Sequence, residues 1–191
     1  MIVYDVEIIK AIPSSNEKRI SGIEYCQGWG DHANMGISVI CAYDYAEQRY
    51  HVFCEDNFKE FKSLVLNNFV VGFNSESFDD KVCDANGICV NTGYDILREV
   101  YKAKGSEPYP EKFDSRYKGY GLNALAQLTL GAQKTGHGAP APIDWQLGNI
   151  GKVISCCIND VRITKELFDQ IIAGSPLIDP INRKNLFLKR P

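Results

Sequence analysis

The chain has 191 residues, of which 45% are hydrophobic and 24% charged, and its formal net charge is −3. This composition is typical of a folded globular protein and argues against extended disorder. The negative balance excludes a protein that holds nucleic acid through bulk positive charge, although a local basic strip is compatible with it. No apolar run approaches the roughly 20 residues that cross a bilayer. We therefore expect no membrane segment and a cytoplasmic location.

The N-terminal residues, Met-Ile-Val-Tyr-Asp-Val-Glu, carry acids where a signal peptide would carry basic residues. Seven cysteines are present, which is an odd number, and none of them forms a Cys-x-x-Cys pair. A zinc site therefore has little support. Because most of the cysteines lie among apolar residues, we expect reduced and mostly buried thiols in a reducing compartment.

The first part of the chain predicts several strands followed by a helix. Short stretches rich in β-branched and aromatic residues are strand candidates at 2–9, 19–27, 36–45 and 48–54. The tight connection at 44–47 favours an antiparallel meander. Apolar residues then recur at helical spacing over 58–65, which predicts a helix there.

The rest of the chain alternates strand and helix. We expect a strand at 69–73, helices at about 78–86, 95–103, 122–130 and 149–173, and an edge strand at 185–189. The segment 132–142 is rich in Gly, Ala and Pro and is too long for a tight turn, so it is a candidate functional loop. Without repeats or a shift in composition, the pattern predicts one α/β domain over residues 1–191 with a mixed sheet.

Two acids stand two positions apart on the first predicted strand. Because strand side chains alternate between faces, Asp5 and Glu7 project from the same face. Two like charges are costly there unless a cation lies between them, and Mg²⁺ or Mn²⁺ is the usual partner of carboxylate oxygens. The alternative is an edge strand whose acids are solvated. For this pattern alone, that alternative is the better interpretation.

A second group of polar residues lies where a strand gives way to a helix. Asn74 can fix the turn, Phe78 can anchor in the core, and Asp79 can emerge in the first helical turn. Ordinary N-capping by Asn, Ser and Asp explains the same pattern. We expect Asp80 to be a solvated neighbour, and Asp95 to cap the helix that begins there.

The third element is the long helix near the end of the chain. Cys156 and Asp160 are four residues apart and therefore share one side of it. An acid that borders an apolar stripe is often only a boundary residue in contact with water. The functional interpretation gains weight because the three elements occur together and in order.

In combination these motifs resemble the DEDD superfamily of 3′–5′ exonucleases. The motifs are Asp5-x-Glu7, Asn74-x-x-x-Phe78-Asp79 and Asp160. The residues from Lys134 to His137 and those around Asp160 look like a branch found in phage and prophage proteins and beside helicases. The resemblance implies a ribonuclease H-like fold, which is a mixed five-stranded sheet with helices on both faces.

The resemblance also implies the parts of a catalytic site. Two divalent ions, Mg²⁺ or Mn²⁺, would lie about 4 Å apart. Their implied ligands are Asp5, Glu7, Asp79 and Asp160, and the expected substrate contacts are Asn74, Phe78, Lys134 and Cys156.

The sequence departs from the family at the water-activating residue. The family places a Tyr four residues before the last Asp, or a His five before it, whereas this chain has Cys156 and Ser155. An unperturbed thiol is largely protonated at neutral pH and is a poor ligand for hard ions. His137, in the glycine-rich loop, is the remaining candidate for the proton acceptor.

The expected function is metal-dependent 3′–5′ hydrolysis of single-stranded nucleic acid ends, of DNA before RNA, beside a helicase or another replication or repair protein. Residues 98–118 interleave basic and aromatic side chains, which suits a single-strand channel. A solvated loop that packs on the sheet explains them equally well. One alternative is a module with weakened catalysis that binds nucleic acid or a replication partner. Another is an interaction protein whose acids are only caps and surface residues.

Overall fold

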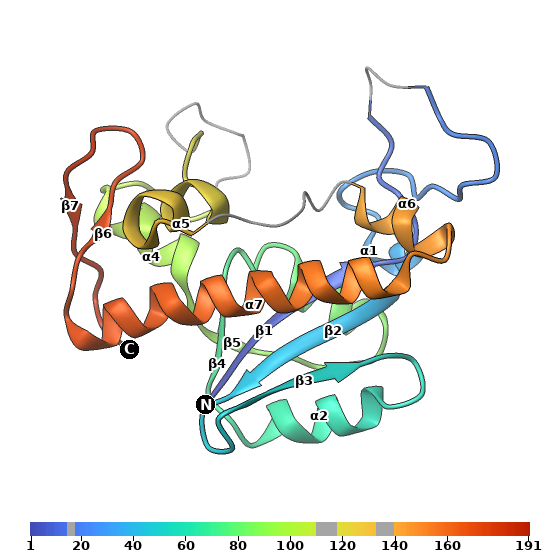
Figure 1. Cartoon of the computed structure of the whole chain (residues 1–191), viewed down its shortest axis with the longest axis horizontal. Helices are drawn as coiled ribbons and strands as arrows, with labels where there is room; N and C mark the ends of the chain where they lie inside the picture. Colours follow the sequence, from blue (N-terminus) through green and yellow to red (C-terminus); the bar gives the residue numbers. More distant parts are fainter. Residues whose placement is uncertain (15–17, 110–117, 133–139) are drawn as a thin grey trace.

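The computed structural model describes residues 1–14, 18–109, 118–132 and 140–191. These residues form an α/β fold in which helices cover both faces of a five-stranded sheet (Figure 1). Its strands are β1 (Ile2–Ile8), β2 (Ile37–Asp44), β3 (Arg49–Phe53), β4 (Val70–Gly72) and β5 (Thr92–Asp95). The predicted mixed five-stranded sheet is confirmed.

The sheet has the order β3-β2-β1-β4-β5. β1, β2 and β3 form an antiparallel meander, while β4 and β5 run parallel to β1. β1 is therefore a central strand, and the expectation of a solvated edge strand is wrong for its acids. β4 pairs only with Ile2 and Val3, so the remainder of β1 has no strand partner on that side among the described residues.

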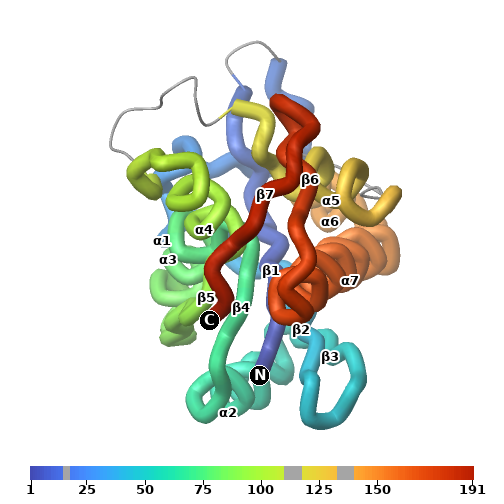
Figure 2. Tube along the Cα trace, turned by 90° about the vertical axis from the view of Figure 1, so that its left-hand side faces the viewer, coloured from blue at the N-terminus to red at the C-terminus, as the bar shows by residue number. Residues whose placement is uncertain are grey.

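Helices lie on both faces of the sheet. They are α1 (His32–Met35), α2 (Phe58–Leu66), α3 (Asp79–Ala85), α4 (Ile96–Ala103), α5 (Leu122–Leu130), α6 (Ala141–Gln146) and α7 (Ile150–Ala173). One buried cluster joins the sheet to α1, α2 and α3, and the other joins it to α4, α5, α6 and α7. Figure 2 shows α3 and α7 on opposite sides of the strands. None of the helices in the described ranges is both long and apolar enough to span a membrane.

Several local predictions need correction. Residues 19–27 form no strand, because the chain turns at Gly22, where φ is +81°, and only Tyr25 forms a bridge, to Ala11. The expected edge strand near the C-terminus instead forms β7 (Asn185–Leu186), which pairs with β6 (Leu177–Ile178) in a separate two-stranded sheet.

The strand β5 and the helix α6 lie where no such element was predicted. β5 reads Thr-Gly-Tyr-Asp, which resembles a turn. A Cβ at Gly93 would lie 2.5 Å from the ring of Phe69, so any larger residue there would have to displace that ring. α6 begins inside the segment predicted as a loop, and the long helix α7 agrees with its predicted range and ends at Gly174. All seven cysteines are free thiols, and four of them are buried.

Candidate metal centre

The four predicted carboxylates line one cleft of about 970 Å³. Asp5 and Glu7 come from β1, Asp79 begins α3, and Asp160 lies on α7. Carboxylate oxygens of Asp5, Glu7 and Asp160 all lie within 4.8 Å of one another. The fold thus brings together acids that are spread from residue 5 to residue 160.

The position of β1 explains why these acids are gathered. Alternate residues of the strand face the α7 side of the sheet, where Val3 enters the core and Asp5 and Glu7 follow it. Glu7 and Asp160 are both buried, with 7% and 5% of their surface exposed. Buried carboxylates this close together repel each other unless a cation compensates their charge. These residues therefore fit the oxygen ligand set of a hard divalent ion.

Asp79 adds a fourth carboxylate at the start of α3. Burial raises its pKa well above the ordinary value, and the nearby Asp5 and Asp80 carboxylates raise it further. No side chain caps the N-terminus of α3, and Phe78 occupies the cap position. Ordinary N-capping is therefore not the role of this segment.

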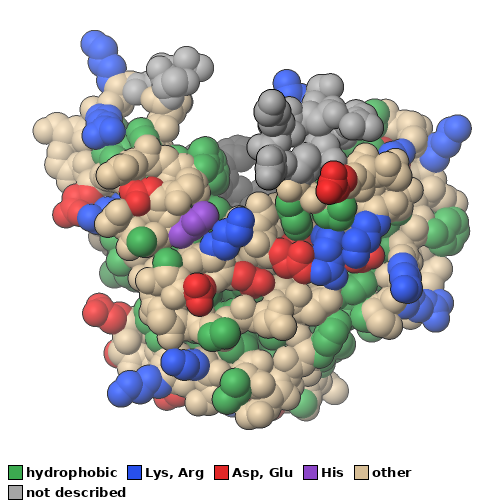
Figure 3. All heavy atoms as spheres, turned by 180° about the vertical axis from the view of Figure 1, so that it is seen from behind, with side chains coloured by type: hydrophobic (Ala, Val, Ile, Leu, Met, Phe, Trp, Pro, Cys, Tyr) green, Lys and Arg blue, Asp and Glu red, His purple; other side chains and the backbone are tan. Residues whose placement is uncertain are grey.

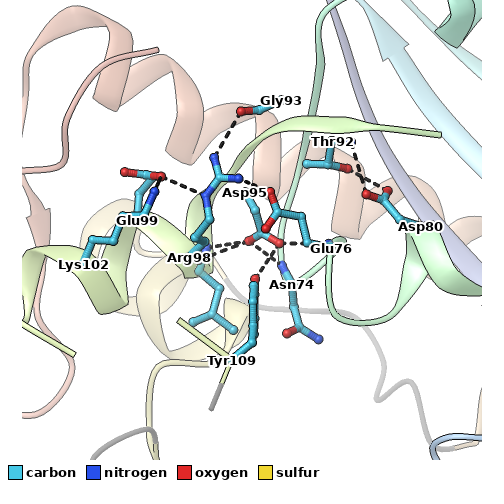
Figure 4. A network of polar contacts seen from close by, with 11 residues as sticks. Asn74, Glu76, Asp80, Thr92, Gly93, Asp95, Arg98, Glu99, Lys102 and Tyr109 are labelled. Carbon is cyan, nitrogen blue, oxygen red and sulfur yellow. Dashed lines mark hydrogen bonds and ion pairs between the residues drawn. The ribbon is translucent and has the colours of Figure 1, made fainter. Parts of the chain in front are cut away.

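The turn before Asp79 is held by the buried carboxylate of Asp95 (Figure 4). Asp95 accepts hydrogen bonds from the backbone N–H groups of Asn74, at 2.9 Å, and Glu76, at 3.1 Å. Asn74 has a φ of +66°, which is a left-handed conformation, so the turn depends on such outside support. Asp95 is thus an anchor for the segment that leads into Asp79.

The same carboxylate caps α4, as the sequence predicts. It accepts bonds from the backbone N–H groups of Leu97 and Arg98 and from the Tyr109 hydroxyl, the last at 2.6 Å. Burial raises the pKa of Asp95, although these hydrogen bonds oppose the shift. Arg98 adds a second tie, because its guanidinium contacts Glu76 and donates to Glu99 at 2.9 Å.

Asp80 is a structural residue, so its predicted role as a solvated neighbour is wrong. It accepts a hydrogen bond from the Tyr4 hydroxyl and two from Thr92, through its backbone N–H at 3.1 Å and its hydroxyl at 2.8 Å. These bonds connect the first turn of α3 to β1 and β5. The bonds of Asp80 to β1 and β5 therefore constrain the orientation of Asp79, the residue before it.

The structure does not place Cys156 where a substrate contact was expected, and the adjacent Cys157 of α7 has a different environment. Cys156 is half-buried and is not among the described residues that line the cleft. Cys157 is fully buried, and its thiol lies 3.5 Å from the backbone oxygen of Asp5, to which it donates. Its size and position place it beneath β1, where a larger side chain would displace the strand that carries Asp5 and Glu7.

The predicted proton acceptor, His137, and the predicted phosphate contact, Lys134, lie outside the described residues. Within the described cleft wall there is no histidine, and the tyrosines are Tyr101 and Tyr120. Burial and the Asp179 carboxylate raise the pKa of Tyr120, which disfavours its use as a base.

Asn74 and Phe78 both line the cleft, as expected for substrate contacts. Phe78 packs edge-on against Trp29 and His32, with ring centroids 5.8 and 5.9 Å away. Trp29 was not among the residues expected at the site. A signal was present, because this tryptophan lies in a glycine-containing loop with no strand or helix pattern around it.

A second group of possible ligands occurs at the β2–β3 turn, formed by Asp44, Glu47 and His51. Its charge is already compensated, since Arg49 contacts Glu47 at 2.6 Å and the backbone N–H of Ala46 donates to Asp44 at 2.7 Å. On the rear face, acidic and basic side chains are interspersed, without a continuous basic surface (Figure 3). Because the acids at the β2–β3 turn already have partners, the cleft is the better candidate for a metal centre.

No protein-family model matches this sequence, and no curated protein does either.

Proposed function

We propose that this protein is a metal-dependent 3′–5′ exonuclease with a ribonuclease H-like fold. The observation that carries the proposal is the convergence of Asp5, Glu7, Asp79 and Asp160 in one cleft. The mixed sheet with helices on both faces agrees with the fold that the sequence motifs imply. The substrate would be a single-stranded nucleic acid end, of DNA before RNA, and a helicase or another replication or repair protein would act beside it.

The residues present fit a pair of Mg²⁺ or Mn²⁺ ions. Four carboxylates offer hard oxygen ligands and a charge of about −4, which two dications would balance. When bound, such ions supply an activated water and stabilise the leaving 3′ oxygen. The chain itself positions one of these ligands, because Asp95 and Asp80 hold the segment that carries Asp79.

The wall of the cleft suits an unpaired strand. Phe73, Phe78, Tyr101 and Tyr120 line it together with the acids. Aromatic rings hold unpaired bases by stacking, whereas the bases of a duplex are already covered by their neighbours. The substrate phosphate would enter beside carboxylates whose charge the bound ions offset.

Digestion of a 5′-labelled single-stranded oligonucleotide in Mg²⁺ or Mn²⁺ tests the proposal. We expect a ladder that shortens from the 3′ end, and a loss of more than about a hundredfold in rate for Asp160→Asn, since even outer-shell partners of a metal typically contribute 10–100-fold. Asp84→Asn removes an exposed carboxylate of α3 and should keep the wild-type rate. An intact substrate in both metals would contradict the exonuclease proposal, and retained binding would then favour the nucleic-acid-binding module.

A further inference from the structure

The β6–β7 hairpin carries positive charge that no described acid balances. Residues 177–191 contain one acid and four basic residues, and the basic residues are Arg183, Lys184, Lys189 and Arg190. The acid, Asp179, is buried and already pairs with Lys104 at 2.7 Å. Arg183 and Lys184 are exposed, and neither forms an ion pair with a described residue. In a chain whose net charge is −3, this hairpin is therefore a local basic surface.

Hydrogen bonds give the turn between β6 and β7 a defined shape. The Asp179 carboxylate accepts bonds from the backbone N–H groups of Ile181, at 2.8 Å, and Asn182, at 3.3 Å. The Arg183 N–H donates to the Asp179 carbonyl at 2.9 Å, and the Lys184 N–H donates to the Asn182 side chain at the same distance. Arg183 has a φ of +61°, a conformation that Gly or Asn adopts more readily than Arg. The turn thus presents two adjacent cations on a backbone of fixed shape.

This turn lies against the wall of the acidic cleft. The side chain of Ile181 comes so close to Gly119 that a Cβ there would lie 2.6 Å from it. The next residue, Tyr120, lines the cleft, and its hydroxyl contacts the Lys104–Asp179 pair below the turn. Figure 2 shows the hairpin beside α5, and β6 packs against that helix. A strand that leaves the cleft past Tyr120 would therefore meet the two cations of the turn.

We infer that Arg183 and Lys184 bind the phosphate backbone of a strand whose 3′ end occupies the cleft. An arginine guanidinium binds phosphate oxygens through paired hydrogen bonds, and a lysine ammonium binds them as a point charge. The acids of the cleft repel every phosphate that bound metal ions do not hold, so a contact with the rest of the strand has to lie outside the cleft. The inference rests on the proposed function and adds a substrate class to it. Only a strand long enough to reach from the cleft to the hairpin gains this contact.

Binding of short and long strands tests the inference. The Kd values of labelled oligodeoxythymidines of about 4 and about 20 nucleotides are measured by fluorescence anisotropy over a series of salt concentrations. Ca²⁺ replaces Mg²⁺, since its flexible coordination substitutes poorly for Mg²⁺. The variant combines Arg183→Asn with Lys184→Gln, because Asn removes the charge and suits the left-handed backbone at this position.

We expect the variant to bind the long strand about 5- to 25-fold more weakly than the wild type near 0.1 M salt. The slope of log K against log[salt] should become shallower by about 1.4, since each phosphate contact on a single strand contributes about 0.7. The Kd of the short strand should change by less than about twofold, because that strand does not reach the hairpin.

Lys59→Gln combined with Lys62→Gln is the matched control, because it removes two positive charges from exposed positions on α2, which lies away from the β6–β7 turn (Figure 1, Figure 2). An equal loss of affinity for both strands, or an equal loss in the control, would overturn the inference. An unchanged Kd for the long strand, in a protein that still shortens a labelled strand, would refute the hairpin contact alone and favour an acidic protein as its partner. A length-dependent loss of affinity in the variant, without any hydrolysis by the wild type in Mg²⁺ or Mn²⁺, would refute the exonuclease proposal alone.

Discussion

At the scale of single residues, Asp79 shows most clearly what the cleft demands. Its carboxylate is buried beside that of Asp5, so the negative charge is disfavoured in the metal-free protein. Such an arrangement lowers the stability of the metal-free protein, and a bound cation would offset this loss. The energetic signature of the site is therefore measurable without any assay of activity.

We predict that Asp79→Asn stabilises the metal-free protein increasingly as the pH rises above 3.8. The pKa of Asp79 is raised by folding, so the native state binds this proton more tightly than the unfolded chain does. The free energy of unfolding of the wild type must then fall as the pH rises from about the ordinary value, 3.8, through the raised one. The amide of the Asp79→Asn variant carries no charge, so the variant does not lose this stability as the pH rises.

Urea unfolding with a chelator present, over a series of pH values, measures the effect. The advantage of Asp79→Asn should grow as the pH rises through the raised pKa of Asp79 and should shrink as the pH falls toward 3.8. Asp84→Asn, in the same helix but exposed, should show no such trend. If the stability difference between Asp79→Asn and the wild type did not change with pH above 3.8, the acids of the cleft would not be in conflict.

Cys156 and His137 give a second prediction at this scale. Because Cys156 lies outside the described cleft wall, Cys156→Ser should change the rate of hydrolysis by less than about twofold. His137→Ala should slow it by at least about tenfold if this histidine accepts the proton, since general bases contribute 10²–10⁴-fold. Rates of hydrolysis measured at several pH values around neutral distinguish the roles of the two residues. Full activity of His137→Ala would remove His137 from the mechanism, and a large loss in Cys156→Ser would assign a role to the thiol.

At the scale of elements, the junction between β4 and α3 depends on contacts from β5 and α4. Asp95 joins the backbone of the Asn74 turn to the first turn of α4, and Tyr109 closes the arrangement. We predict that Asp95→Ala lowers the free energy of unfolding by about 2 kcal/mol or more, because it removes a helix cap and leaves buried N–H groups unpaired. Tyr109→Phe should lose about 1 kcal/mol, the net value of one hydrogen bond.

Both variants should also reduce kcat more than they change KM, because they loosen the segment that positions Asp79 without removing a ligand. Denaturant unfolding and steady-state kinetics check the two effects. Lys102→Met is a suitable control, since it removes an ion pair between the exposed Lys102 and the buried Glu99 of the same helix. Glu99 keeps its bond from Arg98, and Asp95 is untouched. An unfolding midpoint for Asp95→Ala that equals the wild type would show that the turn holds its shape unaided.

The site was predictable where a short-range pattern determines it. Asp5 and Glu7 share a face because strands alternate, whereas Asp79 and Asp160 were expected at the site only because the motifs resemble those of the exonuclease superfamily. The sequence does place Asp95 as the cap of α4, close to the site. The bond from the Asn74 backbone to Asp95 and the bonds from Tyr4 and Thr92 to Asp80 were not predictable, because these partners are distant in sequence or belong to a strand that resembles a turn. Trp29 was missed for a similar reason, since only the folded loop places it beside Phe78.

The helices and strands also separate into those that the sequence predicts and those that it does not. The meander and the helices α2, α3, α4, α5 and α7 follow from periodicity and end signals. β5 is short and contains a glycine, and its strand character comes from parallel pairing with β4 and from the burial of Tyr94. Residues 19–27 have strand composition but no neighbouring strand in the described structure, so composition alone misleads there.

At the scale of the whole molecule, the sheet explains why the cleft lies where it does. β1 is the central strand, but β4 pairs with it only as far as Val3. Beyond that residue, α3 and α7 approach this edge of β1 from the two faces of the sheet. Three segments that are far apart in sequence thereby deliver their acids to one place. The proposed activity therefore depends on these acids binding a pair of metal ions.

Electron paramagnetic resonance of the protein titrated with Mn²⁺ tests that claim most directly. We expect two bound ions per chain with spin coupling, because the pair would lie about 3.5–4 Å apart. Asp5→Asn should abolish the coupled signal, while His51→Ala, at the turn between β2 and β3, should retain it. Uncoupled or absent binding in the wild type, or a coupled signal that survives Asp5→Asn, would contradict the account.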